Sequence, residues 1–415
     1  MEMKKYKLGE IAKNITDGEH GTVIDDITGA YYLLSNKNII NGQILINPKT
    51  DRRINKETFD KINKRTKLEK GDVLISTVGT LGKTCIVEEK INYTLQRSVG
   101  IIKPNLDVLK SKYLMYLLMT DFYQNLLINN SKGAVQKCIF IDDLKQLPIQ
   151  IPSLPTQQKI AAVLSSLDDK IALNKKINAK LEAMAKRLYD YWFVQFDYPD
   201  KNGKPYKTSG GKVVWNEVFK RKIPEGWEVG NLYEIADYIN GLACQNYRPQ
   251  DEEIFLPVIK IKEMHEGITS DTEKVSATIP EKYIIFDGDI LFSWSATLEV
   301  MIWTGGKGGL NQHIFKVVPK SYFTKEYVFQ QLSSYIVNFQ KMAEARKTTM
   351  GHITSDHINQ SRIVIPPKEV INAFSKKTLP IFNYQLTIQK EIQKLTKLRD
   401  RLLPLLMNGQ VEVEG

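Results

Sequence analysis

The sequence predicts an α+β protein made of two similar domains in tandem, each followed by a long helix. Three observations lead to this prediction. Short runs of β-branched and aromatic residues alternate with helical patterns, the two halves of the chain resemble each other, and two segments have the hydrophobic spacing of a coiled coil. The chain has 415 residues, 42% of them apolar, which suits about three folded domains at roughly 150 residues each.

The internal resemblance is a duplication with a period near 214 to 217 residues. Three pairs of segments carry it: KGDVLIS (70–76) with DGDILFS (287–293), IDDLKQLPIQIP (141–152) with SDHINQSRIVIP (355–366), and KLGEIAKNITDG (7–18) with NLYEIADYINGL (231–242). This period is far longer than a solenoid unit. We therefore expect two copies of one domain, at residues 1–152 and 223–366.

Each copy contains short strands followed by a helical segment. Runs bounded by Gly, Asp or Pro predict strands in 72–77, 84–89, 98–104, 289–294 and 313–319. A 3.6-residue pattern predicts helices in 111–127 and 324–345. Strands followed by separate helices indicate the α+β class.

The first long helix is predicted within residues 153–200, from Thr156 to about Phe196. Its apolar residues alternate at spacings of three and four, as in a coiled-coil seam. The seam positions are Leu164, Leu167, Ile171, Asn174, Asn178, Leu181, Ala185, Leu188 and Trp192. Buried amides such as those of Asn174 and Asn178 cost stability and fix the register of a helix pair.

The second long helix is predicted within residues 367–415. We expect it to start at Pro380, after a shorter helical segment from Lys368, and to have Pro404 in its last turn. Its seam positions are Thr378, Ile381, Gln385, Ile388, Ile392, Leu395, Arg399, Leu402 and Leu406. A helix of about forty residues is near 60 Å long, too long for one domain to cover. Mutual pairing is therefore predicted, and the alternative is that each helix packs on its own domain.

Residues 201–222 form a connector rich in Gly, Pro, Ser and Lys. They hold seven basic residues and one acidic residue. Such a segment either is simply solvated or contacts phosphate groups. Both interpretations remain open from the sequence.

Composition narrows the class of protein. The net charge is +11 and the pI is about 9.2, so a polyanion such as nucleic acid is the expected partner. No stretch approaches the roughly 18 apolar residues of a membrane span, and we expect a cytoplasmic protein. Cys85, Cys138 and Cys244 lack paired spacing and are expected to be reduced thiols.

The sequence contains no complete match to the catalytic motifs considered. TVGTLGKT (77–84) lacks the first glycine of a phosphate-binding loop and is interpreted as a turn between strands. The only Pro-Pro pair, Pro366-Pro367, is not part of an amine-methyltransferase tetrapeptide. Neither a nuclease carboxylate-lysine cluster nor a metal-type histidine pair is evident. The chain is therefore expected to be non-catalytic.

Loops between strands are the expected nucleic-acid surface, because their polar side chains can reach base edges while basic residues hold phosphates. In the first copy the candidates are Lys83, Gln96, Arg97, Lys132, Gln136 and Lys137. In the second copy they are Trp294, Lys307, Asn311, Gln312, His313, Arg346, Lys347 and His352. Gln96 and Gln312 are 216 residues apart and precede equivalent strands. Residues 307–366 have eight basic and three acidic residues, whereas 223–306 are strongly acidic and are expected to face away from DNA.

Residues 151–197, IPSLPTQQKIAAVLSSLDDKIALNKKINAKLEAMAKRLYDYWFVQFD, followed by NGKPYKTSGGKVVWNEVFKRKIPEGWEV (202–229), resemble the central region of the DNA-specificity subunit of type I restriction-modification systems. The resemblance extends over the whole chain, to LTKLRDRLLPLLMNGQVEV (395–413). It implies two target-recognition domains and two helices pairing as an antiparallel coiled coil with pseudo-twofold symmetry. The segment KEVINAF after Pro367 departs from the LPTQQKI pattern after Pro152.

The resemblance also implies a division of labour. This subunit would bind a bipartite target in double-stranded DNA, with the helix pair setting the spacing and two methylase subunits docking on the helices. Restriction-translocase subunits could join the complex. No cofactor would belong to this chain, and S-adenosylmethionine, ATP and Mg would belong to partner subunits. The alternatives are a stand-alone sequence-specific DNA-binding protein and an enzyme of unfamiliar fold.

Overall fold

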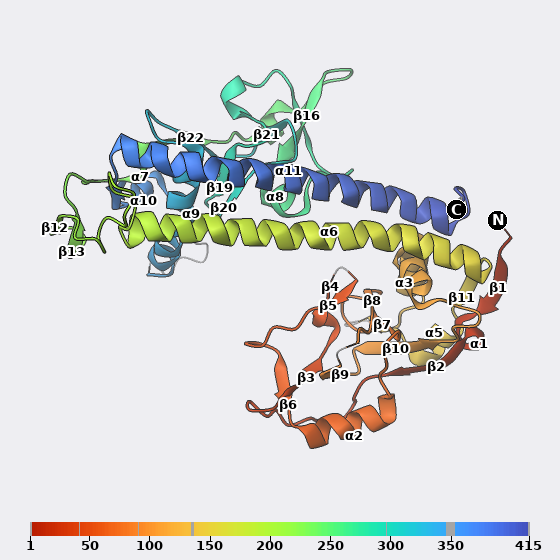
Figure 1. Cartoon of the computed structure of the whole chain (residues 1–415). Helices are drawn as coiled ribbons and strands as arrows, with labels where there is room; N and C mark the ends of the chain where they lie inside the picture. The colour runs from red at the N-terminus through yellow and green to blue at the C-terminus, as the bar shows by residue number, and fades with distance from the viewer. Residues whose placement is uncertain are drawn as a thin grey trace. The chain divides into compact units, whose positions relative to one another are not determined.

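The computed structural model describes residues 2–413 except 41, 90, 134–136, 296 and 346–352, and leaves the side chains of 343–345 undescribed. It divides the chain into two compact units. Figure 1 shows the helices and strands of both. Unit 1 comprises Met1–Ile171 and Leu395–Gly415, and unit 2 comprises Ala172–Lys394. Parts of both long helices thus belong to each unit.

Unit 1 contains small sheets and short helices. Its strands are β1 (Lys4–Lys7), β2 (Ala12–Asp17), β3 (Tyr31–Leu34), β4 (Ile39–Ile40), β5 (Gln43–Ile44), β6 (Arg52–Ile54), β7 (Val73–Ser76), β8 (Thr84–Ile86), β9 (Tyr93–Leu95), β10 (Val99–Pro104) and β11 (Pro148–Ile151). They form a four-stranded sheet β2-β10-β7-β8, a three-stranded sheet β6-β3-β9, and the pairs β1-β11 and β4-β5. Its short helices are α1 (Leu8–Ile11), η1 (Asn36–Asn38), α2 (Lys56–Thr66), α3 (Ser111–Met119), α4 (Asp121–Asn129) and α5 (Ile141–Lys145).

Unit 2 repeats this plan. Its strands are β12 (Val213–Asn216), β13 (Arg221–Pro224), β14 (Glu228–Gly230), β15 (Ala236–Asn240), β16 (Phe255–Ile259), β17 (Lys274–Ser276), β18 (Ile284–Ile285), β19 (Ile290–Ser293), β20 (Glu299–Ile302), β21 (Gly308–Leu310), β22 (Ile314–Pro319) and β23 (Ile363–Ile365). They form the sheets β15-β22-β19-β20 and β17-β16-β21-β18, and the pairs β12-β13 and β14-β23. Its shorter helices are α7 (Leu232–Ile235), η3 (Cys244–Tyr247), α8 (Ile261–Glu266), η4 (Glu281–Tyr283), α9 (Lys325–Ala345) and α10 (Ser355–Asn359).

The predicted duplication is confirmed by the strand order. The sheet β2-β10-β7-β8 matches β15-β22-β19-β20, and the pair β1-β11 matches β14-β23. Among the described residues, both units also contain a parallel strand pair, β3-β9 in unit 1 and β16-β21 in unit 2. All five predicted strand segments contain strands, and the segment predicted as a helix at 111–127 is divided into α3 and α4 at Thr120.

The two long helices are α6 (Leu154–Tyr189), which continues as the π-helical turn η2 (Asp190–Val194), and α11 (Lys368–Met407). In unit 1, the Arg399 guanidinium lies 2.8 Å from the Asp168 carboxylate. In unit 2, the Phe374 ring centroid lies 5.6 Å from that of Trp192.

Within each unit, these contacts show that α6 and α11 run in opposite directions. In unit 2, Phe374 meets Trp192, whereas Ile381 lies in a groove with Met184. In unit 1, Glu412 lies with Thr156 in one cavity, while Arg399 meets Asp168 farther along α6. The predicted antiparallel pairing of the helices is therefore confirmed inside both units.

The predicted start of the second helix at Pro380 is wrong, because α11 is continuous from Lys368 and has Pro380 in its interior. A proline there removes one helical hydrogen bond. Phe374 and Thr378 on one side and Phe382 on the other are all buried, so packing holds the helix together across the proline. Pro404 lies in the last turn, as predicted.

The connector at 201–222 is folded and contains β12 and the start of β13, which pair antiparallel, whereas its composition predicted only a solvated or phosphate-contacting segment. Asp197 accepts hydrogen bonds from the backbone and the hydroxyl of Thr208, each at 2.7 Å. The Tyr198 ring stacks on Tyr206 at 4.7 Å and on Trp227 at 5.2 Å. These aromatic contacts bury apolar surface that a solvated linker would expose.

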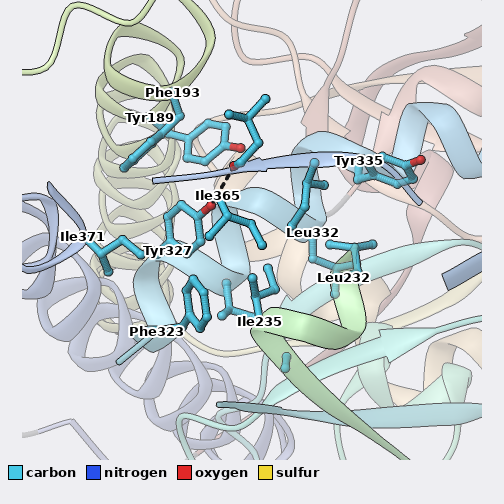
Figure 2. Close-up of a cluster of buried hydrophobic side chains, with 14 of the residues drawn as sticks. Tyr189, Phe193, Leu232, Ile235, Phe323, Tyr327, Leu332, Tyr335, Ile365 and Ile371 are labelled. Atoms are coloured by element: carbon cyan, nitrogen blue, oxygen red, sulfur yellow. Dashed lines mark hydrogen bonds between the residues drawn. The ribbon is translucent and has the colours of Figure 1, made fainter. Parts of the chain in front are cut away.

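The core of unit 2 joins the helices to the domain. Tyr189 and Phe193 from the end of α6 lie beside Tyr327 of α9, with Ile365 and Ile371 close by (Figure 2). The Phe193 and Tyr327 ring centroids are 5.1 Å apart. This cluster fixes the position of the second domain on the helix ends of its own unit.

The three cysteines are free thiols, as expected from their spacing. Cys85 and Cys244 are buried. Burial raises the pKa of the Cys85 thiol to about 12 and that of Cys244 to about 11, so both stay protonated at neutral pH.

Candidate nucleic-acid interface

In unit 1, three loops meet at one edge of the four-stranded sheet. The Glu19 amide donates to the carbonyl of Leu95 at 2.7 Å, and the Arg97 amide donates to the carbonyl of Glu19 at 3.0 Å. The Thr77 amide donates to the carbonyl of Ser98 at 2.9 Å. These bonds hold the loop containing Gln96 and Arg97 between the segment after β2 and the turn after β7. Gln96 is partly exposed and Arg97 is exposed.

The turn between β7 and β8 belongs to the same edge, and its prediction as a glycine-containing turn is confirmed. Gly79 and Gly82 both have φ of 77°, a left-handed conformation that favours glycine. The Ser76 hydroxyl donates to the carbonyl of Thr80 at 2.6 Å and accepts the Lys83 amide at 2.8 Å. Lys83 is exposed at the end of this turn.

A third segment, around residues 131–139, lies against this turn. The Ile139 amide donates to the carbonyl of Thr77 at 2.9 Å. Lys132 and Lys137 are exposed on it, but Lys132 already pairs with Asp143 at 3.0 Å. Gln136 lies outside the described residues.

Unit 2 builds the same edge with three matching backbone bonds. The Leu242 amide donates to the carbonyl of Leu310, the Trp294 amide to that of His313, and the Ile353 amide to that of Trp294, at 3.0, 3.3 and 3.0 Å. The Trp294 indole donates to Asn240 Oδ1 at 3.0 Å.

The other candidates of unit 2 differ in exposure. Lys307 and His313 are exposed and Gln312 is partly exposed, whereas Asn311 is 5% exposed and its Oδ1 accepts the His313 amide at 3.4 Å. Arg346, Lys347 and His352 lie outside the described residues.

The structural match between the loops differs by one residue from the sequence pairing of Gln96 with Gln312. The Gln96 amide donates to the carbonyl of Leu34 at 2.8 Å, and the Asn311 amide donates to that of Ile259 at 3.2 Å. Gln96 therefore corresponds to Asn311. The alignment continues without a gap, so Arg97 corresponds to Gln312.

Three further polar residues lie next to the predicted loop of unit 1, and sequence reasoning did not select them. Asn36 donates to the carbonyl of Val78 at 2.7 Å, His20 lies 2.6 Å from the Asp17 carboxylate, and Arg65 lies 3.8 Å from the same carboxylate. Asn36 and Arg65 are far from each other in sequence and match no motif. Only the fold brings them to this edge.

The predicted seam residues are buried or partly buried along both helices. Asn174 is 2% exposed and Asn178 is 8% exposed. The Asn178 amide donates to Glu182 at 2.8 Å, and burial raises the pKa of the Glu182 carboxyl. Burying these amides lowers the stability of the helix pair, and it favours one register of the pair over others.

Comparison with known proteins places this arrangement in a family. A family model for the type I restriction modification DNA specificity domain matches residues 2–183 and 224–398. The chain is 25% identical to the type I restriction enzyme HindI specificity subunit of Haemophilus influenzae, over 99% of this chain and 100% of that protein. It is 26% identical to the MjaIX specificity subunit of Methanocaldococcus jannaschii, over 100% of this chain and 94% of that protein.

A solved structure shares the fold. The S subunit of a type I restriction-modification system from M. genitalium superimposes with a TM-score of 0.60 at 15% identity, covering 98% of this chain and 96% of that one. This likeness shows that the chain has the fold of that subunit, with two tandem domains and two long helices.

The chain belongs to the family of type I restriction modification DNA specificity domains and carries two copies of the domain. It is a DNA sequence-recognition subunit of a type I complex, without catalysis of its own. Within the described residues, no helix combines the length and the apolar character needed to cross a membrane.

Proposed function

We propose that the two domains, residues 1–152 and 223–366, each read one half of a bipartite target through the loop edges described above. The observation that carries this proposal is that one backbone framework occurs twice and presents different side chains. Exposed Arg97 of unit 1 is replaced by partly exposed Gln312 in unit 2, and partly exposed Gln96 is replaced by Asn311, which is only 5% exposed. An unchanged frame with changed side chains is suited to reading two different base sequences.

The helix pair would set the distance between the half-sites. Continuous helices of 36 and 40 residues are stiff on the scale of a binding site. Antiparallel contacts inside both units support a fixed register, and the buried amides of Asn174 and Asn178 favour one alignment over others. A fixed rod length then corresponds to a fixed number of spacer base pairs.

Two methylase subunits would dock on the helices. In unit 2, Met184 of α6 and Tyr191 of η2 line a groove of about 590 Å³ with Ile381 of α11. Met184 is 54% exposed, and Leu398 of α11 in unit 1 is 42% exposed. Exposed apolar side chains on a helix favour contact with a partner protein.

The reactions would then belong to those partners. The methylase subunits would carry S-adenosylmethionine, and restriction-translocase subunits would use ATP and Mg if they join. The complex would act on DNA in the cytoplasm.

The proposed division between the domains is testable by selection from random duplexes. Gln96→Ala should relax base choice in one half-site, and Gln312→Ala should relax it in the other, because each removes side-chain contacts to base edges. Lys282→Gln, an exposed substitution in the acidic part of unit 2, is the control. The proposal fails if either glutamine variant changes both half-sites equally.

A further inference from the structure

Unit 2 contains a small pocket, of about 140 Å³, between α9, β23 and the segment around β13. Arg221 and Arg362 both line it. All of its lining residues are described, and neither Asp nor Glu is among them. Two guanidinium groups at one pocket repel each other, and an anion between them would remove that repulsion.

The charge of Arg221 has no carboxylate partner among the described residues. Its guanidinium lies 4.8 Å from the Phe196 ring centroid and 5.8 Å from that of Phe219. Its Nε is buried without a hydrogen bond, and burial lowers the pKa of the guanidinium. An anion would supply both the missing acceptor and the missing countercharge.

The other polar groups at the pocket also offer donors. Arg362 donates to the backbone carbonyls of Asn359 at 3.4 Å and Ser361 at 3.0 Å, so its charge is not neutralised by a carboxylate there. Gln331 Oε1 accepts from the Tyr189 and Tyr327 hydroxyls at 2.9 and 3.3 Å, which leaves its amide nitrogen available as a donor. A site rich in donors and poor in acceptors is suited to phosphate.

The folded connector next to the pocket is basic. Lys212 and Lys220 pair with Glu225 and Glu217, at 2.6 and 2.8 Å. The remaining lysines of the connector are exposed and form no ion pair with any described residue: Lys201, Lys204, Lys207 and Lys222. A concentration of unpaired positive charge favours a polyanion over a single acidic side chain.

The pocket also lies near the expected DNA loops of its own unit. Ser334 and Asn338 line it from α9, which ends at Ala345, and the candidate residues Arg346 and Lys347 follow directly in the sequence. Seven helical residues from Asn338 to Ala345 span about 10 Å. This distance corresponds to about three phosphates of one strand.

We infer that the pocket holds a phosphate group of the DNA backbone beside the second half-site. It would act as a sequence-independent clamp, with Arg221 and Arg362 as the charged donors. This inference rests on the proposed function, because it takes the loop edge of unit 2 to face DNA. No equivalent clamp is expected in unit 1, because Pro148 occupies the place of Arg362 at the repeat offset of 214.

The test is the salt dependence of DNA binding by the full chain. Arg221→Gln and Arg362→Gln should each reduce the slope of log K against log salt by about 0.9, and lower affinity about eightfold at 0.1 M salt. The loss should be equal on target and random duplexes. Arg248→Gln, which changes an exposed arginine in the acidic part of unit 2, is the matched control and should have no effect. Thermal unfolding checks that the variants are folded. If Arg221→Gln unfolds the chain because its ring contacts are lost, Arg362→Gln alone tests the inference.

Two outcomes would overturn the inference. The first is an unchanged slope in folded Arg362→Gln. The second is stabilisation of the wild-type chain by inorganic phosphate, lost in Arg362→Gln, while that variant binds DNA normally; the pocket would then take free phosphate only. The salt slope can be measured on random DNA, so this test does not depend on sequence choice. If the wild-type chain showed no preference for a target sequence, the proposed function would fail and the test of the pocket would remain valid.

Discussion

The two units hold their domains to the helices with different chemistry. In unit 1, the Asp168 carboxylate of α6 accepts from the Tyr116 hydroxyl at 2.6 Å and from Arg399 of α11 at 2.8 Å. In unit 2, Phe374 of α11 packs against Tyr189 of α6 and Phe193 of η2, with ring centroids 6.4 and 4.9 Å away.

The repeat shows that unit 2 has no counterpart of this ionic pair at the equivalent positions. At the offset of 214, Phe382 occupies the place of Asp168 in unit 2, and Ala185 occupies that of Arg399. The aromatic junction of unit 2 lies at other repeat positions, because Phe374 and Tyr189 correspond to Ile160 and Leu403 of unit 1. The duplicated fold therefore requires that the domain be fixed to both helices, but it does not prescribe how.

The aromatic junction should be the more sensitive of the two. Phe374→Ala removes a side chain that is 0% exposed, and we expect a loss of about 3–5 kcal/mol in the free energy of unfolding. Denaturant unfolding of the full chain measures this. Phe122→Ala, at a side chain that is 64% exposed, is the control, and equal losses for the two variants would contradict the comparison.

The ionic junction should contribute less. Asp168→Asn removes the charge that Arg399 pairs with, and we expect a loss of about 1–2 kcal/mol because both side chains are partly exposed, at 32% and 22%. The unfolding free energy of Asp168→Asn, Arg399→Met and the double variant gives the coupling between them. Additive losses would show that the pair contributes nothing specific.

The loops of the two units differ in charge at the matched positions of Arg97 and Gln312. Exchanging these two residues tests the comparison of the units, and its expected effect is smaller than that of the two preceding tests. Arg97→Gln gives unit 1 the residue of unit 2, and should reduce the salt slope of DNA binding by about 0.9. Gln312→Arg should increase it by a similar amount. The slopes on random duplex measure both changes, and the placement of these two positions against DNA is wrong if neither slope moves.

Much of the architecture could be predicted from the sequence because it depends on periodic patterns. The repeated segments predicted the duplication, and the three-and-four spacing predicted the pairing of the helices. The prediction that the second helix starts at Pro380 was wrong. The tendency of proline to interrupt a helix was outweighed by burial of Phe374 and Phe382 on either side. The folded connector was missed for a similar reason: stacking of Tyr198 with Tyr206 and Trp227 has no periodic signature.

The candidate interface was predictable only in part. Loop positions such as Gln96 and Arg97 followed from the strand pattern. Asn36, His20 and Arg65 were not identified, since the fold brings them to the same edge from separate segments. The pairing of Gln96 with Gln312 was off by one residue because equal spacing cannot replace the hydrogen bonds that define equivalent positions.

The central claim is that the helices measure the gap between two half-sites, and the length of the rod tests it most directly. Inserting seven residues into each helix, after Lys176 in α6 and at the position facing it in α11, should lengthen the pair by about 10 Å and keep its faces aligned within about 20°. Sequencing the methylated positions in cells that contain the modified chain and its methylase should show the same half-sites separated by about three more base pairs. Unchanged half-sites at an unchanged separation would contradict the account.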